Sequence, residues 1–413
     1  MTLENFDQLL QKYADVIIHK GIQVAADDYL LINADIEQAP LVRLLAETAY
    51  KAGAKKVKVT WADDALTRIG YENQSVETLT DIPQYTIDES NDWITKRAKR
   101  IALRSSNPNA LSGIDPSKIS AAQRAASEAL QEQRIATQAN VVSWLVVAGA
   151  GQEWAKLVFP ELSTTEEKVD ALWNEIFKTT RVYEADPVKA WNEHEAKLNE
   201  KAHFLNEIQF DHLHYTGPGT DLKLGLPKNH IWESAGSVNE KGEAFIANMP
   251  TEEVFTAPDA NRAEGHITSS KPLSYGGTVI DGRTFDFENG QITDVKAEQG
   301  EETLRKLVED NDGSRSLGEV ALVPHQSPIS QSGIIFYNTL FDENASNHLA
   351  IGQAYATSVQ GGTKMSQDEL KEAGLNRSNV HVDFMVGNAE MNIDGITTDG
   401  KVIPVFRNGE WAI

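Results

Sequence analysis

The spacing of apolar residues changes close to Gln209 from a helical period to the alternation typical of strands. This change limits the possible folds more than any other feature of the chain. Before it, apolar residues at helical spacing alternate with short buried runs at residues 29–32 and 57–61. Strands separated by helices predict parallel pairing in an open α/β sheet. After it, apolar and polar residues alternate over short runs bounded by turn signals, which predicts antiparallel strands.

The N-terminal half contains four expected strands and several helices. The expected strands are residues 29–32, 57–61, 101–103 and 141–147, with helices at 6–17 and from Pro40 to about residue 49. Residues 151–208 are expected to be mostly helical, with a capping box at Ser163 and Glu166 and a long charged helix from Pro187. No glycine-rich nucleotide-binding motif follows these strands, so the sequence does not predict a nucleotide site.

The C-terminal half carries hairpin signals at Asp281-Gly282, Asn289-Gly290, Asp399-Gly400 and Asn408-Gly409. Strand-like alternation occurs at residues 211–215, 221–226, 381–386 and 402–406, and one helix is expected near 301–309. The predicted fold class is therefore α/β, in two domains. Residues 1–190 would form an open, Rossmann-like α/β domain with a helical extension, and residues 191–413 an antiparallel-rich α+β catalytic domain that binds metal.

Composition excludes several classes of function. The chain has no cysteine, so thiolate metal sites and cysteine nucleophiles are absent. Its 61 acidic and 38 basic residues give a formal net charge of −23, which repels nucleic acid and anionic membranes. The N-terminus has no secretory pattern, and the longest apolar run, residues 141–150, is half of the roughly 20 residues that a membrane helix needs. We expect a cytoplasmic protein without nucleic-acid or membrane partners.

Residues 341–355 collect chemically active side chains. Asp342, Glu343, His348 and Tyr355 bring two carboxylates, an imidazole and a phenol into fifteen residues, with few aliphatic positions before Leu349. A segment that served only the core would not have this composition. The run is therefore predicted to contribute to a site.

His381 and Asp383 are spaced as alternate residues of a predicted strand. Residues i and i+2 of a strand point to the same face, so the imidazole and the carboxylate project together. That pair suits a divalent ion, although the spacing alone is a weak signal. His212 and His214 have the same spacing without an acid-rich segment, and we interpret them as surface residues.

Further acids lie in apolar surroundings. The alternation of Leu317, Glu319, Ala321 and Val323 places Glu319 on an apolar face and predicts its burial. A buried carboxylate is costly unless it is paired or binds a metal. Glu252 and Glu253 lie in a similar apolar frame between two prolines, and only one of them needs to point inward.

Taken together, these runs resemble one known family. The runs P-T-E-E-V-F-T-A-P from Pro250, L-G-E-V-A-L-V-P from Leu317, F-D-E-N-A-x-x-H-x-A-x-G-x-A-Y from Phe341 and H-x-D from His381 are similar to those of the aminopeptidase T / aminopeptidase S metallo-aminopeptidases. Residues 49–57 and 134–144 also look like that family. The resemblance covers most of the chain. It implies a homodimeric, two-metal exopeptidase that removes N-terminal residues from short peptides with a free N-terminus.

The resemblance also implies the site residues. The implied metal ligands are Glu253, Glu319, His348, His381 and Asp383, with Glu343 either a sixth ligand or the residue that orients His348. Carboxylate and imidazole suit Zn²⁺, Co²⁺, Mn²⁺ or Mg²⁺. Four carboxylates balance two divalent ions, and Glu319 is expected to bridge them.

The expected mechanism is attack of a metal-activated water at this dinuclear site. Tyr355 would donate to the oxyanion, and it would lie on about the same face as His348 if residues 349–356 form a helix. Glu253 or Glu343 would carry the proton to the leaving amine. We assign Val254, Phe255 and Tyr275 to core packing rather than to a substrate pocket.

Two other functions stay compatible with the acids and histidines alone. One is a different two-metal hydrolase, a deacylase or a phosphoesterase; against the phosphoesterase, Arg315 is the only arginine near Glu319 on its N-terminal side. The other is a non-catalytic protein that binds metal or peptide. Tyr355 and the surplus of carboxylates argue against a purely structural metal, which needs only four saturating ligands.

Overall fold

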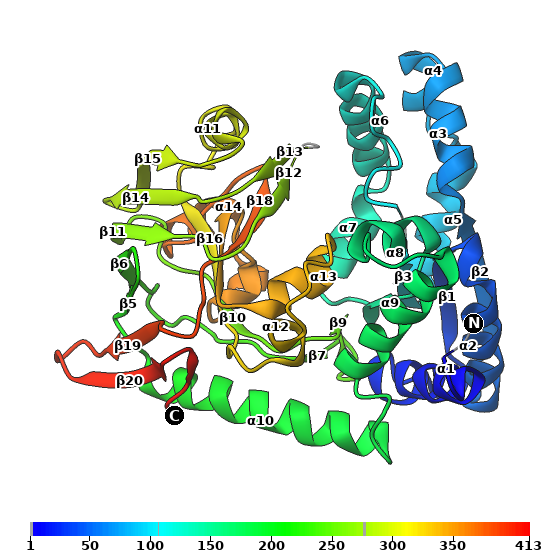
Figure 1. The fold of residues 1–413 in the computed structure, drawn as a ribbon, viewed down its shortest axis with the longest axis horizontal. Helices are drawn as coiled ribbons and strands as arrows, with labels where there is room; N and C mark the ends of the chain where they lie inside the picture. Colours follow the sequence, from blue (N-terminus) through cyan, green and yellow to red (C-terminus); the bar gives the residue numbers. More distant parts are fainter. Residues whose placement is uncertain (1–2, 106, 276–277) are drawn as a thin grey trace. The chain divides into compact units, whose positions relative to one another are not determined.

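The computed structural model describes residues 3–105, 107–275 and 278–413 (Figure 1). Packing groups the residues into two compact units, Met1–His194 with Gly236–Pro250, and Glu195–Ala235 with Thr251–Ile413. The predicted fold class is confirmed, because one sheet is wholly parallel and the other sheets are antiparallel. The predicted domain division between residues 190 and 191 stays a prediction.

The first unit is built on a five-stranded parallel sheet in the order β2-β1-β3-β4-β9. Its strands are β1 (Tyr29–Asp35), β2 (Lys56–Ala62), β3 (Lys99–Arg104), β4 (Trp144–Ala148) and β9 (Asn248–Met249). Its helices are α1 (Phe6–Val16), α2 (Ala39–Lys51), α3 (Asp64–Asn73), α4 (Val76–Thr80), α5 (Gln84–Thr95), α6 (Pro116–Ala129), α7 (Gln131–Gln138), α8 (Gln152–Val158) and α9 (Thr165–Thr179). A small hairpin of β7 (Gly236–Val238) and β8 (Ala244–Ile246) also belongs to it.

Two boundaries in this unit differ from the prediction. The fourth strand begins at Trp144 rather than at residue 141, because Asn140 adopts a left-handed turn and Val141 N donates to Ala136 O, which closes the preceding helix. The capping box joins Thr164 and Glu167, one residue later than expected. A run of Ser, Thr and Glu offers the same spacing twice, and only the register of α9 decides between the two positions.

The second unit contains an eight-stranded sheet in the order β15-β14-β11-β6-β5-β19-β20-β21 and a four-stranded sheet in the order β10-β16-β17-β18. The strands of the larger sheet are β5 (His212–Gly217), β6 (Thr220–Gly225), β11 (Ala263–Thr268), β14 (Thr284–Glu288), β15 (Gln291–Lys296), β19 (Asn392–Ile396), β20 (Val402–Arg407) and β21 (Glu410–Trp411). Those of the smaller sheet are β10 (Val254–Thr256), β16 (Leu317–Leu322), β17 (His348–Gly352) and β18 (His381–Met385).

The remaining elements of this unit are short, apart from one long helix. They are β12 (Leu273–Tyr275), β13 (Thr278–Ile280), α11 (Glu301–Glu309), α12 (Pro328–Ser332), α13 (Thr339–Asp342) and α14 (Gln367–Glu372). The expected charged helix is confirmed as α10 (Pro187–Ile208), which begins in the first unit and packs Leu198, Ala202 and Leu205 into the core of the second. No helix among the described residues combines the length and the apolar composition needed to span a bilayer.

Three of the four hairpin signals are confirmed. Asn289-Gly290 joins β14 to β15, Asn408-Gly409 joins β20 to β21, and Asp399-Gly400 lies in the loop between β19 and β20. The prediction for Asp281-Gly282 was wrong, because β13 pairs with β12 whereas β14 pairs with β11 and β15. The buried Arg283 donates to the carbonyls of residues 280 and 271, and this directs the chain from one sheet to the other.

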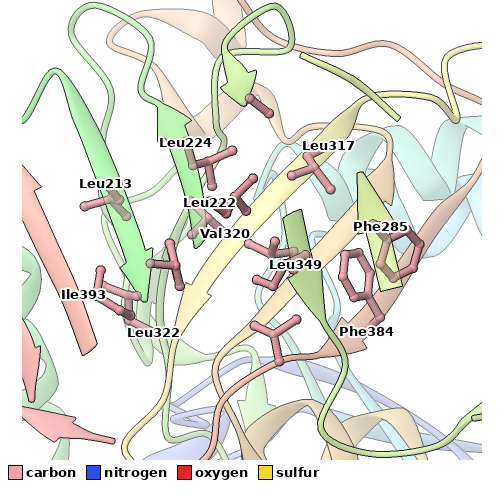
Figure 2. Packing of buried hydrophobic residues seen from close by; sticks show 14 of the residues in the cluster. Leu213, Leu222, Leu224, Phe285, Leu317, Val320, Leu322, Leu349, Phe384 and Ile393 are labelled. Carbon is pink, nitrogen blue, oxygen red and sulfur yellow. The ribbon is translucent and has the colours of Figure 1, made fainter. Parts of the chain in front are cut away.

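The core of the second unit lies between its two large sheets (Figure 2). Leu213, Leu222 and Leu224 of the eight-stranded sheet belong to the same cluster as side chains of the four-stranded sheet. The rings of Phe285 and Phe384 join the two sheets, with centroids 4.4 Å apart. One face of the four-stranded sheet is thus occupied by core packing, and the opposite face is available for polar side chains.

Removing the charge of Asp35 should stabilise the first unit above pH 6. Burial, with Asp64 and Glu37 nearby, raises the pKa of Asp35 from 3.8 to about 6. The folded state therefore binds a proton that the unfolded state has lost, and stability falls as pH rises through this window. We expect Asp35→Asn to raise the free energy of unfolding at pH 7.5 by about 1 kcal/mol after allowance for solvent screening.

The measurement is thermal or denaturant unfolding of the variant and the parent protein at pH 4.0, 5.5 and 7.5. The matched control is Asp81→Asn, which removes the same charge from an exposed position. A gain that is equal at all three pH values, or equal in both variants, would contradict the prediction.

Candidate metal centre

The register of the four-stranded sheet places the predicted site residues on one face. Ala321 pairs with His348, and Ala350 pairs with both Glu319 and Asp383. Residues paired across antiparallel strands point to the same side of the sheet. The opposite side carries Val320, Leu322, Leu349 and Phe384, which lie in the hydrophobic core (Figure 2).

A bulge at Gly318 sets the face on which Glu319 lies. The register of β16 against β17 shifts between Leu317 and Glu319. Leu317 is therefore packed in the core with Val320 and Leu322, while Glu319 projects from the other face. The predicted alternation from Leu317 to Glu319 was wrong, because a bulge inserts one residue and breaks the period of two. The predicted burial of Glu319 is confirmed, since it is 7% exposed.

Four acid–imidazole approaches define the centre. His348 Nε2 lies 3.3 Å from Glu253 Oε2 and 3.4 Å from Glu319 Oε1. His381 Nε2 lies 3.7 Å from Glu319 Oε2 and 3.4 Å from Asp383 Oδ1. The two oxygens of Glu319 thus face different histidines. The structure brings together two groups of potential ligands that share this carboxylate, one with Glu253 and His348 and one with His381 and Asp383.

Main-chain carbonyls fix the orientation of both imidazole rings. His348 Nδ1 lies 3.1 Å from Ser346 O, and His381 Nδ1 lies 2.7 Å from Gln353 O. A carbonyl oxygen only accepts, so each Nδ1 carries the hydrogen and donates. In the neutral ring the lone pair is then on Nε2, the atom that faces the carboxylates. This is the arrangement in which histidine binds a metal ion.

The pKa values of the two histidines are raised by the carboxylates that surround them. Burial alone would lower the pKa of His381, but Asp383 and Glu319 outweigh it and raise the value to about 9. Burial alone would also lower the pKa of His348. Glu253 and Glu319 outweigh this effect and raise the pKa well above its usual range. The proton on each ring is stabilised by the negative charges of the carboxylates around it. The centre therefore attracts cations, and a divalent ion can replace these protons.

Glu343 faces the same centre but lies outside the two groups of potential ligands. Burial raises its pKa well above the ordinary value, and the charges of Glu253 and Asp383 add to this effect. Its Oε1 is 3.5 Å from the amide nitrogen of the neighbouring Asn344. The structure thus places Glu343 close enough to interact with the other acids, and both predicted roles for it stay open.

Tyr355 reaches the centre from a loop. Its ring centroid lies 5.3 Å from that of His381, and the residue is 42% exposed. The condition of a helix over residues 349–356 is not met, because His348–Gly352 is strand β17 and Tyr355 follows it with extended backbone. The hydroxyl group itself is shielded from water, and this desolvation together with the carboxylates of Glu319 and Asp383 raises the pKa of the phenol, so its proton is retained at neutral pH.

Two buried asparagines that sequence reasoning missed hold the site segments in place. Asn344 Oδ1 accepts from Glu252 N at 2.7 Å, next to Glu253 in the chain. Asn347 Oδ1 accepts from Val323 N at 2.7 Å, at the end of the strand that carries Glu319. Both asparagines are fully or almost fully buried. The available signal was the pair of amides beside Glu343 and His348, in a run that the core would otherwise fill with apolar residues.

The other histidine pair takes no part in these groups of potential ligands. His212 Nδ1 lies 2.8 Å from Asp211 and His214 Nε2 lies 2.7 Å from Asp221. Each histidine is partly exposed and is paired with one acid, His212 with Asp211 directly before β5 and His214 with Asp221 on the neighbouring strand β6. Among the described residues they form no group of three potential ligands, which agrees with their interpretation as surface residues.

Comparison with known proteins identifies the family. The family model described as thermophilic metalloprotease (M29) matches residues 6–411. The chain belongs to the M29 metalloprotease family. It is 55% identical to aminopeptidase PepS of Streptococcus thermophilus and 50% identical to aminopeptidase AmpS of Bacillus subtilis, covering 99% or more of each pair of chains. The solved structure of wild-type AmpT from Thermus thermophilus superposes with a TM-score of 0.93 at 40% identity, covering 99% of this chain and 100% of that one.

These findings confirm the resemblance inferred from the motifs. The match extends over both units of this M29 member, and not only over the acid- and histidine-rich segments. The prediction of a metallo-aminopeptidase is confirmed at the level of the family and its full-length relatives. The family also implies a divalent metal, which agrees with the donor groups of the centre.

Adding a methyl group at Gly318 should displace Glu319 from the centre. A Cβ at this position would lie 2.4 Å from the carbonyl oxygens of Gly352 and Gln353, which are main-chain atoms that cannot rotate away. We expect Gly318→Ala to lower the free energy of unfolding by about 1–3 kcal/mol. It should also weaken metal binding, because the bulge that directs Glu319 must move.

The matched control is Gly217→Ala, at a strand glycine of the same unit whose added Cβ would meet nothing closer than 3.6 Å. Unfolding curves and the metal content after dialysis give the two readouts. Wild-type metal content and stability in Gly318→Ala would show that Glu319 does not depend on this bulge.

Proposed function

We propose that the chain is a dinuclear metallo-aminopeptidase in which Glu319 bridges two divalent ions. One ion would be held by Glu319 with Glu253 and His348, and the other by Glu319 with His381 and Asp383. The observation that carries the proposal is the division of the Glu319 oxygens between two histidines, at 3.4 and 3.7 Å. Glu343 would complete the site, as a sixth ligand or by orienting His348.

The donor groups fit divalent ions for reasons independent of the family. Asp383 Oδ1 is buried and accepts no hydrogen bond from the described residues, although His381 Nε2 lies 3.4 Å away. When His381 is neutral, both atoms present lone pairs to each other, and a cation removes the conflict. Oxygen and imidazole donors suit Zn²⁺, Co²⁺, Mn²⁺ or Mg²⁺. When bound, two such ions supply an activated water and polarise the scissile carbonyl.

The side chains of the protein would perform the proton transfers. Tyr355 keeps its proton at neutral pH and would donate it as a hydrogen bond to the carbonyl oxygen as negative charge develops there. Glu343, which faces the same carboxylates, would give a proton to the leaving amine. Glu253 is the alternative, and it approaches His348 more closely.

The centre also suits the substrate class. An unblocked peptide carries a positive α-amine, which a carboxylate not fully engaged by metal, Glu253 or Glu343, would attract. Short peptides, a homodimeric assembly and a cytoplasmic location stay predictions from the sequence and from the family resemblance. A deacylase is distinguished by its substrate, because it would act on the acylated amine that an aminopeptidase rejects.

The experiment that tests the proposal measures activity and metal content together. The purified protein should hydrolyse leucine 4-nitroanilide and leave its N-acetylated form intact. Chelation should abolish the activity, and Zn²⁺, Co²⁺, Mn²⁺ or Mg²⁺ should restore it, with full activity reached at two ions per chain. Restoration at one ion per chain would reject the dinuclear site, and hydrolysis of the acetylated substrate would reject the aminopeptidase.

Ligand substitutions localise the ions. We expect His381→Ala to retain about one ion fewer than the parent protein, because the ion would lose one of its three predicted donors. The matched control is His214→Ala, which removes the same side chain at the same strand spacing from the surface pair. Equal metal content in the two variants would argue against His381 as a ligand.

Replacing Tyr355 with Phe removes only the hydroxyl group and tests its role as a hydrogen-bond donor. The substitution should lower kcat about 10²-fold, the effect of removing one oxyanion donor, with metal content unchanged. Steady-state kinetics and elemental analysis provide the two readouts. Tyr85→Phe, at a 74% exposed position, is the control. Unchanged turnover in Tyr355→Phe would exclude the donor role.

A further inference from the structure

A cleft of about 320 Å³ opens beside His381 and Asp383, and every residue that lines it belongs to the second unit. Its other walls come mainly from residues 272–275 and 335–339. This volume is near the lower end of the roughly 300–1,000 Å³ that small-molecule pockets span. A single amino acid side chain therefore fits the space, whereas a folded chain does not.

The walls of the cleft are mostly apolar. Leu273, Ile335, Val382 and Met385 supply aliphatic and thioether surface. Tyr275 packs against the core, as its sequence context predicted, and also lines the cleft. Binding of an apolar side chain to such a surface is favourable, because it removes apolar area from water.

The acid in the far wall is already engaged. Asp342 Oδ1 accepts from Phe336 N at 2.8 Å, and its Oδ2 accepts from Asn338 N at 3.0 Å. These amides flank Tyr337, whose backbone has a left-handed φ of 53°, an uncommon conformation for a tyrosine. Asp342 therefore holds the strained segment that forms this wall, and its charge is already close enough to interact with that of Lys271.

The free edge of β18 lies along the cleft. Met385 O accepts from Ser270 N at 2.9 Å, on the side of β18 away from β17, and the chain continues from Ser270 into the wall at residues 272–275. Main-chain groups of strand residues two apart point to the same side, so those of Asp383 and His381 also point toward this edge. A peptide main chain can pair with such an edge while its side chain enters the cleft.

We propose that this cleft receives the side chain of the N-terminal residue of the substrate, and that it selects large apolar side chains. The inference rests on the aminopeptidase function proposed above. Only one residue lies on the amino side of the bond that an aminopeptidase cuts. A bounded cleft that adjoins the metal-ligand candidates meets that requirement, and Ile335 and Tyr337 are then specificity-determining residues.

The test compares kcat/KM of the metal-loaded enzyme on the 4-nitroanilides of alanine, leucine, phenylalanine and lysine. Leucine and phenylalanine should exceed alanine by about tenfold or more, since each buried methylene contributes about 10-fold or more to discrimination. Ile335→Trp fills the cleft. It should reduce kcat/KM for leucine and phenylalanine about tenfold, while alanine stays within about threefold because its methyl group needs little of the space.

The matched control is Val402→Trp, at a 56% exposed strand position of the same unit. Thr339→Trp, at an exposed position of the same wall, gives the same readout if Ile335→Trp does not fold. An equal loss on all four substrates, or a preference of the parent enzyme for lysine over leucine, would overturn the inference. Absence of metal-dependent hydrolysis of any of the four by the parent enzyme would refute the proposed function instead.

Discussion

The repulsion between lone pairs around Glu319 is the constraint on which the site depends. Each oxygen of this buried carboxylate faces the Nε2 of one histidine, and the same two Nε2 atoms also face Glu253 and Asp383. With the Nδ1 hydrogens donated to carbonyls, neutral rings present only acceptors to these acids. In a medium of low dielectric constant this arrangement is unfavourable until positive charge enters. Protons satisfy it in part, and two divalent ions match its four carboxylates.

The hydrophobic core on the opposite face holds this unfavourable arrangement in place. Val320, Leu349 and Phe384 alternate with the site residues along the same three strands (Figure 2). A shift of one residue in any strand would exchange core and site side chains, so the burial of the apolar set fixes the register of the polar set. The segments that lead into the strands are held by the amides of Asn344 and Asn347. Ligands on packed strands are positioned more precisely than ligands on loops.

Local rules predicted the site where the backbone is regular and failed where it is not. His381 and Asp383 share a face because β18 is an unbroken strand. The same rule failed at Leu317, where the bulge at Gly318 reverses the alternation, and a bulge has no signal in the sequence beyond a glycine that also has other uses. The spacing of seven residues between His348 and Tyr355 would suit one face of a helix, whereas pairing with β16 and β18 makes residues 348–352 a strand.

Long-range pairing accounts for most of what the sequence could not supply. The order of the strands brings residues from four distant segments to one face, and no local pattern specifies which strands become neighbours. The family resemblance supplied the list of predicted site residues. The motifs identify these residues, but they do not show how the strands bring them together. The failure at Asp281-Gly282 has the same origin, since a two-residue turn signal was overridden by strands that pair with other partners.

The potential metal ligands lie on strands whereas the phenol of Tyr355 lies on a loop, and this difference has a physical reason. The five acids and histidines of the two potential ligand groups lie on packed strands or at their ends, where small displacements are resisted. Tyr355 lies instead on a loop and is 42% exposed. A hydrogen-bond donor to a developing oxyanion must reach an atom that the substrate brings, and that atom changes its position during the reaction. The loop is attached to the edge of the sheet through the Ser358 carbonyl, which accepts from Ile231 N at 2.7 Å, and through the bond between Glu233 and Thr357. In the proposed role, the phenol would adjust to the substrate while these bonds keep its loop attached to the sheet.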